Sequence, residues 1–127
     1  AGCPDLSFQL LLGYLFQPLA WIMGVPWAEA NAAGALMGEK LVLNEFVAYV
    51  DFIDQKETLS IHTQAVVTFA LCGVANFSSI AILMGGIGAM APDRREEIAQ
   101  LGLKAVLAAT LANFMSASLA GFFLSLN

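Results

Sequence analysis

An apolar run of about thirty residues, from Ile61 to Met90, is interrupted near its middle by the polar sequence GVANFSS. A helix that crosses a membrane needs only about 20 residues. A helix break exposes backbone carbonyl and N–H groups, and hydrocarbon cannot satisfy them. Such a break persists where it lines a cavity or meets a substrate. The sequence therefore predicts a broken transmembrane helix over residues 60–90, with Ser60 as its N-cap.

A second interpretation of this interruption is that it only provides close packing against a neighbouring helix. The small residues that would pack in this way are Gly73, Ala75, Ser78 and Ser79. Asn76 argues against this interpretation, because packing alone does not require an amide within an apolar segment.

The amino-acid composition indicates whether the chain lies in water or in a membrane. Hydrophobic residues make up 59% of the sequence and charged residues 12%, and the mean hydropathy is +0.77, which is typical of a membrane protein. The net charge of −5 is scattered between apolar runs, so nucleic-acid binding is excluded. Cys3, Cys72 and His62 are too few and too scattered for a metal set, and we expect structural or incidental roles for them.

The first segment, residues 1–27, predicts an interfacial helix. Ser7 can cap it, and the amphipathic sequence that follows is interrupted by Gly13 and Pro18. Its aromatic residues, Tyr14, Trp21 and Trp27, favour the headgroup region of a bilayer. The alternative is the end of a kinked transmembrane helix.

Residues 28–54 predict a re-entrant helical hairpin. Ala30, Gly34 and Gly38 recur at every fourth residue, which lets another backbone approach closely. The helix reaches only to about Leu43, roughly 24 Å, which is short of a hydrocarbon core of roughly 30 Å.

The polar residues Lys40, Asn44 and Glu45 lie near the tip of this predicted hairpin. The tip would hold Glu45 near the membrane midplane, where a carboxylate is tolerated only against protein, water or a ligand. Two interpretations stay open for Glu45, a functional group or a structural salt bridge with Lys40.

Residues 94–126 predict the last transmembrane helix. Asp93 can cap it, with Glu96 completing a capping box. Arg94 and Arg95 in the short loop 91–95 indicate the cytoplasmic side, so the C-terminus should be external. We expect a close-packing stripe with Asn113 at the interface. The stripe consists of Ala105, Ala109, Ala112, Ser116 and Ala120.

The segments GEKLVLNEFVAY and LCGVANFSSIAILMGGIGAMAPDRR resemble the two signature regions of the C-terminal domain of concentrative nucleoside transporters. The similarity covers nearly the whole chain, from LLGYLFQPLAWIMGVPW to the final helix. The resemblance implies an all-α membrane protein with an interfacial helix, a re-entrant helical hairpin, a broken transmembrane helix and a final transmembrane helix. Family members are about three times longer, so the chain resembles their second structural repeat, without the N-terminal half.

The resemblance also implies site residues. Glu45, in the family's N-E-F motif, would accept hydrogen bonds from ribose hydroxyls, and Asn76 and Ser79 would complete the sugar contact. Asn44 and Val74 are further substrate-binding candidates. Many relatives have Phe where this chain has Val74, so an aromatic wall near the base is missing, and the sequence does not indicate purine or pyrimidine preference.

The interpretation that follows is nucleoside:cation symport, with this chain supplying the ribose-binding half of the site and no catalytic residues. The family resemblance implies alternating access, a homotrimer in the plasma (inner) membrane, and a Na⁺ or H⁺ coupling site outside this chain. No other cofactor is expected. One rival is a gate-type membrane interaction or assembly protein without a nucleoside site. The other is an intramembrane enzyme using Glu45, which lacks a nucleophile–base pair.

Overall fold

The computed structural model describes residues 7–126, and within this range every regular element is helical. The helices are α1 (Phe8–Ile22), α2 (Trp27–Val42), α3 (Glu45–Gln55), α4 (Ile61–Leu71), α5 (Phe77–Met90) and α6 (Arg95–Ser125). Short 3₁₀ turns lie at Lys56–Thr58 and Pro92–Arg94. The predicted all-α fold is confirmed, while Cys3 lies outside the described residues.

The first helix, α1, runs unbroken through both of its expected interruptions. Ser7 caps it as predicted, and its side-chain oxygen accepts from the Leu10 N–H at 3.2 Å. Pro18 lies inside the helix, so the expectation that it interrupts the run is wrong. An interior proline removes one helical hydrogen bond and favours a kink, but α1 remains one helix over Phe8–Ile22, where it packs on α2. The chain turns at Gly24, whose φ of +100° favours glycine.

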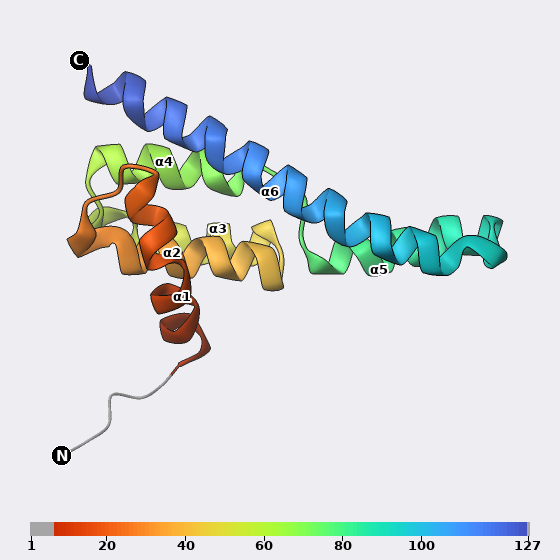
Figure 1. Ribbon diagram of the computed structural model, residues 1–127. Helices are drawn as coiled ribbons and strands as arrows, with labels where there is room; N and C mark the ends of the chain where they lie inside the picture. The colour runs from red at the N-terminus through yellow and green to blue at the C-terminus, as the bar shows by residue number, and fades with distance from the viewer. Residues whose placement is uncertain (1–6, 127) are drawn as a thin grey trace.

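Close packing between α1 and α2 confirms the predicted small-residue stripe. Ala30, Gly34 and Gly38 are all buried. A Cβ on Gly34 would lie 2.9 Å from the backbone nitrogen of Gln17 and from the carbonyl oxygen of Gly13. Only a glycine allows the two backbones to come this close. The helix α1 therefore lies across α2, and their axes differ by 117° (Figure 1).

The helices α2 and α3 form the predicted pair around a tight turn at Leu43 and Asn44. They enclose the hydrophobic core together with α4, which begins at its predicted N-cap Ser60. Completely buried side chains from three helices meet there, among them Leu36, Met37, Ala48 and Val67.

The long helix α6 runs along α5 and then along α4, and so spans the length of the molecule (Figure 1). Its buried face differs from the predicted stripe. The buried residues are Gly102, Val106, Thr110, Phe114, Ala117 and Gly121. Ala105, Ala109, Ala112 and Ser116 are exposed within this chain, and Ala120 is only half-buried. Small residues occur on both faces of α6, and the face that packs is the one with the two glycines.

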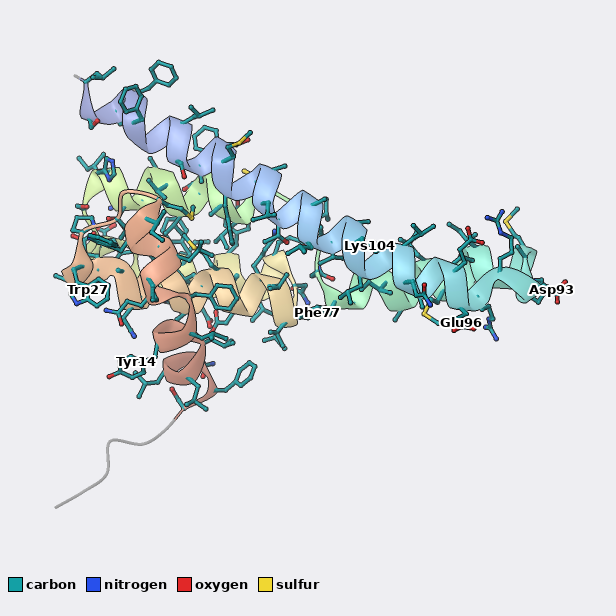
Figure 2. The ribbon with its side chains drawn as sticks, in the orientation of Figure 1. Tyr14, Trp27, Phe77, Asp93, Glu96 and Lys104 are labelled. Atoms are coloured by element: carbon teal, nitrogen blue, oxygen red, sulfur yellow. The ribbon has the colours of Figure 1, made fainter. Side chains whose placement is uncertain are left out.

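The turn between α5 and α6 also corrects a prediction. Arg94 is the N-cap residue of α6, and no side chain caps this helix. The capping box of Asp93 and Glu96 is therefore wrong, because Pro92 starts a 3₁₀ turn that moves the helix start past Asp93. Both side chains lie at the far end of the molecule (Figure 2). Arg94 instead forms an ion pair with Glu97 at 2.7 Å.

One helical segment, Pro92–Ser125, is long and apolar enough to cross a membrane by itself. The bent pair formed by α1 and α2 passes the same test when the two helices are taken together, and α4 and α5 are shorter apolar helices. The outward face of α6 carries exposed large apolar residues, including Leu103, Leu107, Leu111, Met115 and Leu119. An exposed apolar surface of this kind is unfavourable in water and favourable in contact with lipid or with further protein.

Candidate substrate site at the helix breaks

The predicted interruption is a true break between α4 and α5. The helix α4 ends at Leu71, residues 72–76 are not helical, and α5 begins at Phe77. Asn76 is the N-cap of α5, and its Oδ1 accepts from the Ser79 N–H at 3.0 Å. The hydroxyls of Ser78 and Ser79 also donate to this oxygen, at 2.6 and 3.0 Å. Asn76 therefore satisfies the backbone that the break exposes.

The tip of the hairpin repeats this arrangement. Asn44 is the N-cap of α3, and its Oδ1 accepts from the Val47 N–H at 3.0 Å. Glu45 is the first residue of α3. A carboxylate in the first turn of a helix is stabilised by the partial positive charge of the helix N-terminus.

A hydrogen bond joins the two breaks. The Asn76 Nδ2 group donates to Glu45 Oε2 at 3.2 Å and to the Val74 carbonyl oxygen, also at 3.2 Å. Phe77 lies beside the hairpin at the same place (Figure 2). Three of the predicted site residues, Glu45, Asn76 and Val74, thus lie together although 31 positions separate Glu45 from Asn76.

The site keeps free hydrogen-bonding capacity on two side chains. No hydrogen bond from residues 7–126 reaches Glu45 Oε1, and Glu45 is only half-buried. The Ser79 hydroxyl donates toward the Val74 carbonyl or Asn76 Oδ1, so its lone pairs can accept another hydrogen bond. A carboxylate acceptor from the hairpin tip and a hydroxyl from the first turn of α5 suit a ligand with several hydroxyl groups.

Asn76 has a larger structural role than the sequence reasoning assigned to it. Its side chain is 4% exposed, and both its oxygen and its nitrogen are occupied by protein groups. The signal for this role was present in the sequence, because Asn precedes the first residue of an apolar helix and is a preferred N-cap. Val74, in contrast, is 69% exposed.

Asn113 of α6 supports the break from behind, as the sequence predicted. Its Nδ2 donates to the Ala70 carbonyl oxygen at 2.8 Å, which satisfies a carbonyl in the last turn of α4. Gly73 lies directly against this amide, since a Cβ there would be 2.7 Å from Asn113 Nδ2. The packing interpretation of Gly73 therefore holds alongside the break.

Two further side chains hold the site from the hairpin side. Tyr49 donates to the Thr68 carbonyl oxygen at 3.1 Å, and its hydroxyl lies 3.4 Å from Cys72 Sγ. No pattern in the sequence predicted the role of Tyr49, whose hydrogen bond joins α3 to the end of α4. Lys40 is completely buried, and its Nζ has no hydrogen-bond partner within the described residues. It forms no ion pair with Glu45, so the predicted alternative of a salt bridge is not realised.

Interrupted apolar helices whose polar breaks meet define an all-α membrane protein of the transporter class. The sequence matches the family described as Na⁺ dependent nucleoside transporter C-terminus over residues 1–121. The chain belongs to this family, and the predicted resemblance is confirmed.

Individual relatives agree with the family match. The chain is 54% identical to the putative nucleoside permease NupX of Escherichia coli (strain K12), over 98% of this chain and 31% of the permease. It also resembles the solved structure of CNTnw in an inward-facing substrate-bound state, with a TM-score of 0.90 and 53% identity over 97% of this chain and 31% of that one. A CNTnw variant in an outward-facing state gives a TM-score of 0.88 and 53% identity, over 96% of this chain and 31% of that one. The chain thus spans about a third of the length of these relatives.

Proposed function

We propose that this chain is the C-terminal, substrate-binding half of a nucleoside:cation symporter and that it supplies the ribose-binding part of the site. The observation that carries the proposal is the hydrogen bond between Asn76 and Glu45, which joins the hairpin tip to the helix break. Glu45 accepts ribose hydroxyls through its free oxygen, and Ser79 completes the contact. Asn76 holds the carboxylate in position, and Asn44 and Val74 border the sugar and the base.

The same proposal assigns the segments of the chain. Residues 1–27 serve as the interfacial helix, 28–54 as the re-entrant hairpin, 60–90 as the broken transmembrane helix and 94–126 as the last transmembrane helix. The similarity to CNTnw at TM-scores of 0.90 and 0.88 in inward- and outward-facing states supports movement of this part as one unit. Alternating access then displaces the hairpin and the broken helix together against a trimeric scaffold.

The family match supports the membrane location and the partners that we propose for the chain. The symporter is a multi-pass protein of the plasma (inner) membrane, with the loop 91–95 cytoplasmic and the C-terminus external, as Arg94 and Arg95 support. Na⁺ is the coupling cation that the family description names, and its principal site lies in the N-terminal half of the full-length protein. The partners of the chain are membrane lipid, that N-terminal half and two further protomers.

The deciding experiment measures uridine binding to the purified full-length transporter that contains this chain. We expect Glu45→Gln to weaken binding at least tenfold, because hydrogen bonds to a charged acceptor contribute about 1.5–3 kcal/mol. Glu57→Gln is the matched control, since Glu57 is exposed and lies outside the site. Wild-type protein that binds no uridine supports the gate-type alternative. Equal affinity of the wild type and Glu45→Gln removes Glu45 from the site.

A further inference from the structure

A polar cavity lies between α1, α2 and α3, and Glu45, Asn76 and Ser79 are not among its lining residues. Its volume is about 460 Å³. The polar residues that line it are Ser7, Gln9, Asn31, Glu39, Asp51, Asp54 and Gln55. Three of these side chains are acidic and none is basic, so the cavity concentrates negative charge.

Glu39 is the unusual member of this group. It is 1% exposed, and its Oε2 has no hydrogen-bond partner within the described residues. The Asp51 carboxylate of α3 and the Gln9 amide of α1 line the same cavity. Lys40 follows Glu39 in sequence, but neighbouring residues on a helix point in different directions, and Lys40 does not line the cavity.

A buried carboxylate with an unpaired oxygen and a second carboxylate beside it is costly to keep ionised, and a bound cation offsets that cost. The described residues contain no group of three acidic, histidine or cysteine side chains close enough to hold a metal ion. Two carboxylates with amide oxygens and water suit a hard monovalent cation.

We propose that this cavity is a sodium site, with Glu39 and Asp51 as the charged ligands and the Gln9 amide as a neutral one. The Asn31 amide lines the same cavity, and its Nδ2 has no partner among residues 7–126. Rotation about its last side-chain bond exchanges oxygen for nitrogen and gives a fourth oxygen. The volume of 460 Å³ leaves room for several of the ion's waters, each of which occupies about 30 Å³.

The sodium site goes beyond the proposed function, because it is separate from the sugar contacts and additional to the coupling site in the N-terminal half. It ties three helices together, since its ligands come from α1, α2 and α3. Sodium would therefore hold the first helix against the hairpin whose tip carries Glu45.

Equilibrium binding of radioactive sodium to the full-length transporter, without nucleoside, tests the proposal. We expect Glu39→Gln to bind one Na⁺ fewer per protomer than the wild type, and Asp51→Asn to bind that ion at least tenfold more weakly. Asp93→Asn is the control, because it removes an exposed carboxylate from the far end of the molecule (Figure 2). Size-exclusion profiles establish folding, and if Glu39→Gln does not fold, the half-buried Asp51 position decides the question.

An unchanged number and affinity of bound sodium ions in the folded variants overturns the proposal. That result is also expected if a proton, or a basic side chain from the rest of the protein, neutralises Glu39. Uridine binding is measured on the same samples and distinguishes the two proposals. A transporter that loses one Na⁺ in Glu39→Gln but never binds uridine retains the sodium site and refutes the nucleoside function.

Discussion

The hydrogen bond between Asn76 and Glu45 can be separated experimentally from the capping role of Asn76. Asn76→Ala removes both, whereas Asn76→Ser keeps a capping oxygen and loses the amide nitrogen that donates to Glu45 and to the Val74 carbonyl oxygen. Loss of an N-cap costs about 1 kcal/mol. The bond to a charged acceptor has a nominal value of about 1.5–3 kcal/mol, but interhelical hydrogen bonds measured in a membrane protein average about 0.6 kcal/mol.

The structure favours a value between these two figures. Glu45 is half-buried, so water can replace the lost donor, but the acceptor is a carboxylate at a helix N-terminus. We therefore assign about 1 kcal/mol to the bond. Asn76→Ser should lower the free energy of unfolding by about 1 kcal/mol and Asn76→Ala by about 2 kcal/mol.

A double-mutant cycle provides the assay. The full-length protein is unfolded by denaturant in mixed micelles as wild type, Asn76→Ser, Glu45→Ala and the double variant. The coupling energy should be about 1 kcal/mol. Tyr14→Phe, an exposed change on α1 (Figure 2), should leave stability unchanged. Additive effects within about 0.3 kcal/mol would refute the idea that this bond holds the hairpin to the break.

Three further predictions test other parts of the molecule. Gly34→Val should destabilise the protein by about 1–3 kcal/mol or more, because even a Cβ at this position would lie 2.9 Å from the backbone of α1. The same unfolding assay measures this change, and a variant as stable as the wild type would contradict the close packing. Uridine uptake should be competed much less by 2′,3′-dideoxyuridine than by ribonucleosides, and Ser79→Ala should narrow that difference; equal competition in the wild type would contradict sugar reading. An impermeant thiol reagent applied to intact cells should label a cysteine at Ser125 but not one at Asp93, and the opposite pattern would reverse the topology.

Local sequence rules predicted much of this fold. Ser7 and Ser60 cap helices because a hydroxyl before an apolar run satisfies free backbone N–H groups. Gly34 and Gly38 marked the close contact with α1, and Asn113 marked the interface of α6 with the break. In each case the residue type leaves few alternatives in an apolar chain.

The errors arose where local rules allowed two answers. In α6, small residues form more than one stripe, and only the partner helices select the face with Gly102 and Gly121. At the preceding turn, Pro92 shifts the helix start, so Asp93 is not at the capping position. The Asn76 amide donates a hydrogen bond to Glu45, which lies 31 positions away in the sequence. A local sequence pattern does not predict such a contact.

The hairpin tip and the helix break are built in the same way, each with an Asn as the N-cap of the helix that follows. This shared arrangement explains how an apolar protein can hold the carboxylate of Glu45. Asn44 caps α3 and Asn76 caps α5, and the hydrogen bond from Asn76 to Glu45 shows that the two helices begin close to each other. The partial positive charges of both helix N-termini then act near Glu45. Asn76 donates to one carboxylate oxygen and leaves the other free. Under the proposed function, a sugar hydroxyl would bind the free oxygen of Glu45 without displacing Asn76. The ligand would then meet groups that are already in position, which lowers the ordering cost of binding.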